Sequence, residues 1–251
     1  AYMDSIPMVA ITGNVGTSLI GRDSFQEVYI AGITMPITKH NFVVRHVEEL
    51  ADTVREAFRI AQSGRPGPVL IDIPKDVTGA ECEFLPKGKV EVHETYDISE
   101  EQLKTVAEML DKAERPFIYY GGGVELSDAG EALLALMRKA EVPSAHTMMA
   151  IGCVPDDDPL SLGMIGMHGT VSADWAVERS DLLLCIGARF SDRVATNTGH
   201  FAPGARIIHV DIDAAEINKN IDTTFSVVSD AKTFLEKVLP YVNENKHTAW
   251  L

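Results

Sequence analysis

The chain has 251 residues, and its 37 acidic against 22 basic side chains give a net charge of −15 and a pI near 4.9. Hydrophobic residues make up 45% of the chain and charged residues 24%, which excludes a disordered or fibrous protein. No apolar run approaches the roughly 18–20 residues that span a bilayer, and the acidic excess argues against nucleic-acid or membrane partners. Cys82, Cys153 and Cys185 form no CxxC pattern, so we expect no metal site or disulfide framework, and a cytoplasmic location.

The first 86 residues predict a small α/β unit. An apolar strand at residues 7–12 leads into a glycine-containing loop at residues 13–18. Apolar residues recur at helical spacing over about residues 46–62, and Gly64 is placed to stop that helix. The β-branched run at residues 69–73 then predicts a buried strand.

Residues 87–98 are polar and aperiodic, which predicts a linker to a second domain at residues 99–251. Ser99 and Gln102 have the spacing of a helix capping box. Strands then alternate with helices, with strands expected at 116–120, 142–147, 182–186, 206–212 and 225–228, and helices at about 128–139, 170–179 and 230–243. This alternation predicts an α/β fold with a doubly wound, Rossmann-like parallel sheet, preceded by part of a second α/β domain.

Three glycine-containing loops in the second domain are candidate ligand sites. Gly121-Gly-Gly123 lies between a strand and a helix, where either a bound anion or a plain tight turn would explain the glycines. The glycine density of Gly163-Met-Ile-Gly-Met-His-Gly169 favours close approach of a flat ligand over loop packing. Gly187-Ala-Arg-Phe-Ser-Asp-Arg193 follows a buried strand, and its arginines suit a phosphate or a surface ion-pair cluster.

Two other sets of charged residues follow strands. Asp211 and Asp213 end a predicted strand, where an acid can hold a ribose hydroxyl or cap the next helix. In the first domain Lys39, Arg65 and Lys75 suggest an anionic ligand near the strand ends, although a solvated lysine is the plain alternative for Lys39. From these residues alone, the second domain is a nucleotide-type binding domain without an evident nucleophile or general base.

The same strings, taken together, resemble the thiamine-diphosphate enzyme superfamily. They keep order and spacing over nearly the whole chain and comprise Ile11-Thr-Gly13, Ile20-Gly21, Asp23-Ser-Phe-Gln-Glu27, Ile37-Thr-Lys-His-Asn41, Gly64-Arg-Pro-Gly-Pro-Val-Leu70, Ile73-Pro-Lys-Asp76, Gly166-Met-His-Gly169 and the arginine loop. The last two narrow the resemblance to the FAD-containing acetohydroxyacid (acetolactate) synthases, catalytic subunit.

The resemblance implies a partial set of domains. Residues 1–86 resemble the C-terminal part of the pyrimidine-binding domain, and residues 99–251 resemble the central FAD-binding domain. The family's catalytic Glu is expected upstream, and its GDG motif for Mg²⁺ and diphosphate downstream, because no GDG occurs here. We therefore expect a fragment without synthase activity of its own.

Site residues follow from the resemblance position by position. Gln26 would lie beside thiamine diphosphate, and Lys39, Lys75, Met167, Asp192 and Arg193 would line the substrate channel. The implied FAD contacts are Arg65, Gly122, Thr147, Met148, Ile165, Gly166, Met167, His168, Gly187, Ala188, Arg189, Phe190, Ser191, Asp211, Ile212, Asp230 and Ala231. Gly16, Ser24 and Ser191 depart from the usual proline, alanine and aspartate, so inhibitor sensitivity does not transfer and one FAD contact weakens.

The resemblance also implies chemistry and partners. Pyruvate would be decarboxylated and condensed with a second 2-oxo acid to 2-acetolactate or 2-aceto-2-hydroxybutyrate, with a structural FAD. A homodimer or tetramer is expected, with a small regulatory subunit as a candidate partner. The alternatives are a pyruvate oxidase, a glyoxylate carboligase, an oxalyl-CoA decarboxylase that would bind ADP or CoA, or a stand-alone nucleotide-binding module.

Overall fold

The computed structural model describes residues 1–90, 92 and 96–251. The chain divides into two compact units, residues 1–94 and 95–251, which we describe separately. Part of the predicted linker at 87–98, namely residues 91 and 93–95, lies outside the described residues. The described remainder of the linker contains no helix or strand. No helix in the described part of the chain is long and apolar enough to cross a membrane.

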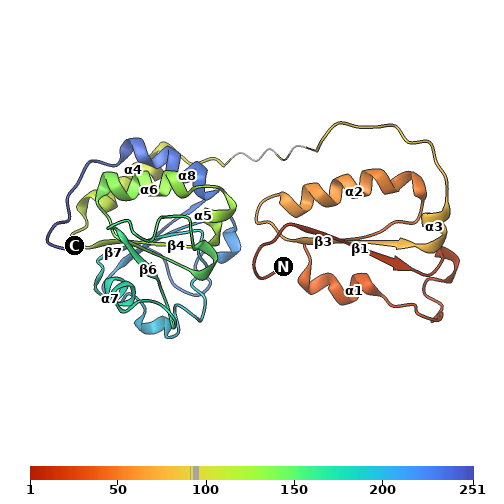
Figure 1. Cartoon of the computed structure of the whole chain (residues 1–251), viewed down its shortest axis with the longest axis horizontal. Coiled ribbons are helices and arrows are strands. Elements are labelled where there is room, and N and C mark those ends of the chain that lie inside the picture. The colour runs from red at the N-terminus through yellow and green to blue at the C-terminus, as the bar shows by residue number, and fades with distance from the viewer. Residues whose placement is uncertain (91, 93–95) are drawn as a thin grey trace. The chain divides into compact units, whose positions relative to one another are not determined.

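The N-terminal unit is built on a three-stranded parallel sheet in the order β1-β3-β2 (Figure 1). The strands are β1 (Met8–Asn14), β2 (His40–Val43) and β3 (Pro68–Pro74), and the helices are α1 (Ile30–Thr34), α2 (Val47–Gln62) and α3 (Lys75–Gly79). The apolar stripe predicted for α2 packs on β3, which is buried along its whole length. The predicted helix and both predicted strands are therefore confirmed, while α1 and β2 carry too weak a pattern to be found from sequence.

The C-terminal unit contains a six-stranded, all-parallel sheet in the order β6-β5-β4-β7-β8-β9. Its strands are β4 (Pro116–Tyr120), β5 (Ser144–His146), β6 (Ser161–Met164), β7 (Leu182–Ile186), β8 (Arg206–Asp211) and β9 (Phe225–Val228). The chain winds outward from β4 in one direction and from β7 in the other. The strand order thus reverses between β4 and β7, which confirms the doubly wound fold and marks the place where such sheets bind ligands.

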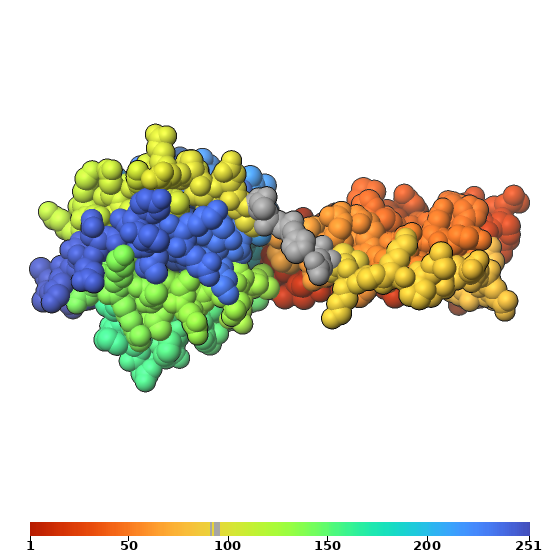
Figure 2. Space-filling view, turned by 90° about the horizontal axis from the view of Figure 1, so that it is seen from above, coloured from red at the N-terminus to blue at the C-terminus, as the bar shows by residue number. Residues whose placement is uncertain are grey.

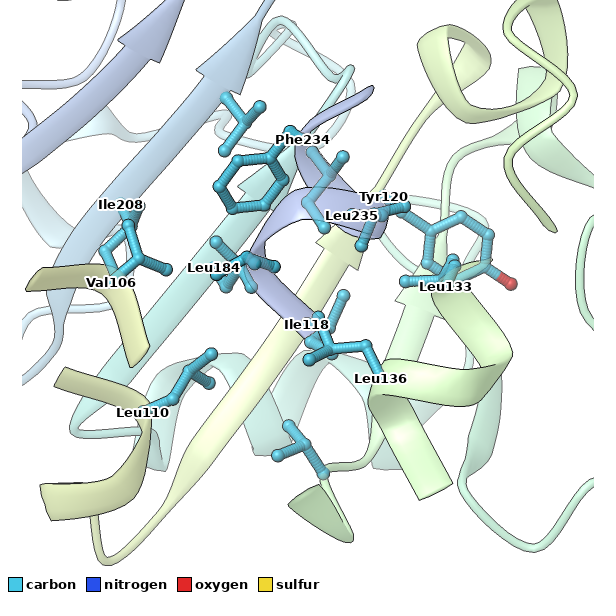
Figure 3. Packing of buried hydrophobic residues seen from close by; sticks show 14 of the residues in the cluster. Val106, Leu110, Ile118, Tyr120, Leu133, Leu136, Leu184, Ile208, Phe234 and Leu235 are labelled. Carbon is cyan, nitrogen blue, oxygen red and sulfur yellow. The ribbon is translucent and has the colours of Figure 1, made fainter. Parts of the chain in front are cut away.

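Helices cover both faces of this sheet. One face carries α4 (Glu100–Lys112), α5 (Gly122–Leu126), α6 (Gly130–Ala140) and α8 (Ala231–Val238), and the other carries α7 (Val171–Arg179) (Figure 1). Figure 2 shows α8, in blue, lying between α4 and α6. Side chains of these three helices interdigitate with those of β4, β7 and β8 to form the larger core (Figure 3).

The boundaries follow local chemistry. The predicted capping box at the start of α4 is present, with Ser99 and Gln102 each bonded to the other's backbone N–H. The last helix, expected to reach residue 243, ends at Val238, because Pro240 lies in the 3₁₀ turn Leu239–Tyr241 that follows. Strand β6 lies inside the segment expected to be a loop, where its glycine-rich sequence gives no strand pattern.

Candidate functional site

The carboxyl ends of β4 and β7 are held together by their glycines. The backbone N–H of Gly123 donates to the carbonyl oxygen of Gly187 at 3.0 Å. A Cβ on Gly121 would lie 2.5 Å from that oxygen, and one on Gly123 would lie 2.7 Å from the Cα of Gly187. These glycines are therefore required by the close approach of two backbone segments. Neither sequence-based interpretation of these glycines, an anion site or a plain turn, included this contact between the ends of β4 and β7.

The loops after β6 and β7 are also packed together. The N–H of Met167 donates to the carbonyl oxygen of Arg193 at 2.9 Å, and a Cβ on Gly166 would lie 2.5 Å from the same oxygen. Gly163 and Gly166 adopt φ of +82° and +103°, and Gly169 is crowded by the backbone at Met164. Gly166 and Gly169 thus serve backbone packing, a role that the sequence-based preference for ligand approach left out, and the approach of a ligand to this loop stays a prediction. The two motifs that carried the resemblance do lie side by side.

The loop that follows β7 leaves backbone donors available. Gly187 and Phe190 both have left-handed backbones, with φ of +59° and +48°. No described residue accepts a hydrogen bond from the N–H groups of Ala188, Arg189 or Phe190. Consecutive N–H groups in a loop of alternating handedness bind anions and other acceptors. This segment is therefore the strongest candidate ligand contact at the strand-order reversal.

Neighbouring residues add polar and apolar contacts at the same edge of the sheet. The Oγ1 atom of Thr147, just after β5, is buried and has no hydrogen-bond partner among the described residues. Met148 is 66% exposed and Met167 56% exposed, so two flexible sulfur-containing side chains flank the edge. Gly122 borders Met149, to whose Cβ an added Cβ would approach within 3.1 Å. An elongated ligand that is rich in acceptors and partly apolar suits this combination.

The acidic residues after β8 and β9 have local structural partners. The carboxylate of Asp211 is buried and accepts from the N–H of Asp213 at 2.9 Å. Asp213 in turn caps the next turn through the N–H of Ala215, and Asp230 caps α8 through the N–H of Thr233. Capping is thus observed, and a ribose contact stays a prediction. Ile212 and Ala231 adjoin these caps.

The remaining predicted contacts of this unit differ in exposure. His168 and Arg193 are exposed, and Asp192 lies 3.9 Å from Arg193 in a solvated pair. Ile165 is buried, and Ser191 uses its carbonyl oxygen to close the turn at Val194. The described residues contain no group of His, Cys, Asp and Glu that could hold a metal ion.

In the N-terminal unit, a pocket of about 180 Å³ lies at the carboxyl edge of the sheet. Its lining includes Asn14 from β1, Val43 from β2 and the buried Asp72 from β3. Glu27 lies at the rim, and hydrogen bonds from the backbone N–H of Gly21, then of Ser24 and Arg22, lower the pKa of its carboxyl. Gln26, next to it, is exposed and held at φ +63°.

The three candidate cations singled out in this unit, Lys39, Arg65 and Lys75, do not converge on one ligand within it. Lys39 and Arg65 precede β2 and β3, whereas Lys75 follows β3 at the opposite, carboxyl edge. Because β3 has seven residues, its two ends, and with them Arg65 and Lys75, are separated by roughly 20 Å. The ammonium group of Lys39 donates to the carbonyl oxygens of Ile60 and Ser63 at the end of α2, and Arg65 donates to Ser5. Of the three, only Lys75 lies at the edge that contains the pocket.

Sequence reasoning missed His209 and Asn220, both of which contact the loop after β7. The Nε2 atom of His209 lies 2.9 Å from the carbonyl oxygen of Ala188, and the amide of Asn220 reaches the carbonyl oxygens of Arg189 and Phe190. His209 lies within a run of strand residues, and nothing in the sequence marks Asn220. Neither gives a motif that could have been recognised.

The reversed strand order defines a doubly wound, Rossmann-like α/β unit, with the donor-rich loop at the reversal. A family model described as the central domain of thiamine pyrophosphate enzymes matches residues 103–238. The chain therefore belongs to the thiamine pyrophosphate enzyme family.

Curated relatives agree over most of the chain. It is 47% identical to the acetolactate synthase isozyme 1 large subunit of Escherichia coli, covering 100% of this chain and 44% of that protein. It is 46% identical to the acetolactate synthase large subunit of Corynebacterium glutamicum (98% and 40%) and 47% identical to the acetolactate synthase of Mycobacterium leprae (95% and 39%). The chain thus spans about two fifths of the length of these relatives.

Proposed function

We propose that the chain is part of the catalytic subunit of an acetolactate synthase. In the complete enzyme, thiamine diphosphate with Mg²⁺ supplies the chemistry that decarboxylates pyruvate and joins the product to a second 2-oxo acid. The products are 2-acetolactate or 2-aceto-2-hydroxybutyrate, in branched-chain amino-acid biosynthesis. The observation that carries the proposal is the identity of 46–47% with synthases of this name over at least 95% of the chain.

Residues 1–86 serve in this proposal as the C-terminal part of the pyrimidine-binding domain. Gln26 borders thiamine diphosphate, and Lys75 presents its ammonium group to the carboxylate of the incoming 2-oxo acid. The position of Lys75 at the pocket edge of the sheet supports this role. Lys39 has its ammonium group on the end of α2, so we assign it to the wall of the channel and not to direct contact with substrate.

Residues 99–251 serve as the central FAD-binding domain. FAD presents phosphate, ribose and ring acceptors along one elongated molecule. The N–H groups of Ala188, Arg189 and Phe190, which have no acceptor among the described residues, match such acceptors. The buried Thr147 hydroxyl and the exposed Met148 and Met167 side chains fit the same ligand. The flavin is structural in this proposal, because the reaction involves no net oxidation or reduction.

The proposed setting is a cytoplasmic homodimer or homotetramer that associates with a small regulatory subunit. Arg193 is exposed and adjacent to Met167, so its guanidinium group is accessible to another subunit or to a carboxylate substrate. In this proposal the Mg²⁺ site belongs to a part of the enzyme outside these 251 residues.

The test has two stages. Purified chain is first examined for bound flavin by its absorbance near 450 nm, with FAD added back where none is retained. The complete reading frame is then assayed for acetolactate formation from pyruvate, with and without thiamine diphosphate. Flavin binding with thiamine-dependent acetolactate formation supports the proposal. Preference for CoA or ADP over FAD, or a continuation without a GDG-type Mg²⁺ site, overturns it.

A further inference from the structure

Three successive carbonyl groups in the loop after β7 are held by side chains from elsewhere in the C-terminal unit. The carbonyl oxygen of Ala188 accepts from Cys185 Sγ at 3.3 Å and from His209 Nε2 at 2.9 Å. The carbonyl oxygens of Arg189 and Phe190 accept from Asn220 Nδ2 at 3.0 and 3.1 Å. The acceptor groups of this loop are therefore satisfied internally, while the N–H groups of the same three residues have no partner among the described residues.

Strand register brings the first two donors together. Cys185 in β7 and His209 in β8 are paired residues of neighbouring parallel strands, and both side chains are completely buried. Ala188 is also buried, so its carbonyl oxygen needs partners inside the protein. A carbonyl oxygen has two lone pairs, and these two side chains use both.

The hydrogen bond fixes which nitrogen of His209 carries a hydrogen. Since a carbonyl oxygen only accepts, Nε2 must donate. The nearest carboxylate oxygen, on Asp211, lies 3.8 Å from Nε2, which is beyond hydrogen-bonding distance. The other ring nitrogen, Nδ1, is buried and has no partner among the described residues. The bond to Ala188 is thus the one hydrogen bond that this buried ring makes to the described residues, and it offsets part of the cost of burying a polar group.

The ring also supports the loop through packing. The ring of Phe190, at its left-handed position, meets the His209 ring edge-to-face with centroids 5.0 Å apart. It also packs on Tyr119 from β4, with centroids 5.7 Å apart. His209 therefore contacts this loop twice, through the carbonyl oxygen of Ala188 and through the ring of Phe190.

We propose that His209 and Asn220 are positioning residues that hold the carbonyl groups of residues 188–190 inward, so that their N–H groups stay available to the acceptor atoms of a flavin dinucleotide. The inference rests on the proposed function. In this role the two residues fix the backbone conformation of the binding loop, and they do not contact the reacting atoms.

The test compares FAD affinity among variants of the whole 251-residue chain, measured by quenching of flavin fluorescence. His209→Leu keeps the bulk but removes the donor, and His209→Gln restores an N–H at a similar reach. Asn220→Ala alters an exposed side chain, so the variant is expected to fold. The matched control is Asn245→Ala, because among the described residues the one partner of the Asn245 side chain is the N–H of its neighbour Lys246.

We expect His209→Leu and Asn220→Ala to raise the dissociation constant for FAD at least tenfold, with His209→Gln and Asn245→Ala within threefold of wild type. Long-range ¹H–¹⁵N correlation of the wild-type histidines should show a hydrogen on Nε2 of His209. If wild type binds FAD and Asn220→Ala and a folded His209→Leu bind it equally well, the inference is wrong and the proposed function stands. If wild type binds no FAD, the proposed flavin site itself fails. If His209→Leu does not fold, Asn220→Ala alone decides.

Discussion

Met167 and Arg193 contact each other through both backbone and side chain. The Met167 N–H donates to the Arg193 carbonyl oxygen at 2.9 Å, and Arg193 Nη1 lies 3.6 Å from the Met167 sulfur. Their loops follow β6 and β7, which are separated in the sheet by β5 and β4. Three strand spacings amount to about 14 Å. The two loops therefore bridge the carboxyl edge of the sheet on either side of the strand-order reversal.

Gly166 makes this bridge possible, and Gly166→Ala should weaken it. The added Cβ would lie 2.5 Å from the Arg193 carbonyl oxygen, in a residue with φ of +103°. Gly152→Ala is the control, since Gly152 has φ of +93° with nothing within 4 Å of the added atom. We expect Gly152→Ala to cost about 1–2 kcal/mol of unfolding free energy from backbone strain alone, and Gly166→Ala to cost at least about 1 kcal/mol more.

Urea denaturation of the two variants measures the difference. The unfolding transition of the C-terminal unit should shift further for Gly166→Ala, and FAD affinity should fall in that variant because the bridge moves. Equal shifts in the two variants would mean that the loops separate at no cost.

The sequence was informative where a pattern repeats and silent where contacts join distant segments. Helices α2 and α4 and strands β3, β4 and β7 were predicted because periodic apolar residues or caps mark them. The bridge between the loops was not predictable, because its glycines look alike whether they face a ligand or another backbone. His209 and Asn220 gain their roles from strand register and a turn, neither of which leaves a local signal.

Gly16→Pro should stabilise the N-terminal unit. Gly16 has φ of −58° and ψ of 149°, a conformation that proline adopts without strain. No described residue accepts a hydrogen bond from the Gly16 N–H, so none is lost. Restricting the unfolded chain should add about 0.4–1 kcal/mol to the free energy of unfolding.

Gly21→Pro is the matched control for that variant. Gly21 has φ of +78°, which proline cannot adopt, and its N–H donates to Glu27. Thermal unfolding should show a higher midpoint for Gly16→Pro and a lower one for Gly21→Pro. A lower midpoint for Gly16→Pro would indicate that the loop at residues 15–19 needs a different backbone.

The three cysteines should differ in their reaction with iodoacetamide. Burial, reinforced by a hydrogen bond to Glu125 at 3.1 Å, raises the pKa of the Cys153 thiol to about 12. At pH 8 about one molecule in ten thousand then carries the reactive thiolate. Burial also raises the pKa of Cys185, whereas Cys82 is exposed. Mass spectrometry should therefore find Cys82 modified first.

The rate at Cys153 should rise about tenfold per pH unit between pH 8 and 11, because the thiolate fraction rises with pH until the pKa is reached. Glu125→Gln removes the negative charge that favours the protonated thiol, and its amide N–H groups can donate to a thiolate. The substitution should lower the pKa of the Cys153 thiol and speed its modification at pH 9. Burial would then be the remaining cause of the raised pKa. An unchanged rate in Glu125→Gln would show that burial alone protects Cys153.

Thr147→Val separates ligand binding from stability at the candidate site. The Thr147 hydroxyl is buried and has no partner among the described residues, so replacing it with a methyl group of similar size removes an unsatisfied polar atom. The ligand-free variant should be as stable as wild type or more stable by up to about 1 kcal/mol. Its affinity for FAD should nevertheless fall several-fold if the hydroxyl bonds the flavin, as a fluorescence titration would show.

Thr170→Val is the control. Thr170 caps α7 through the N–H of Ala173, so the loss of this cap should lower the free energy of unfolding by about 1 kcal/mol without a ligand. A ligand-free Thr147→Val that loses as much stability as Thr170→Val would mean that the hydroxyl has a partner within the protein, and it would remove Thr147 from the flavin site.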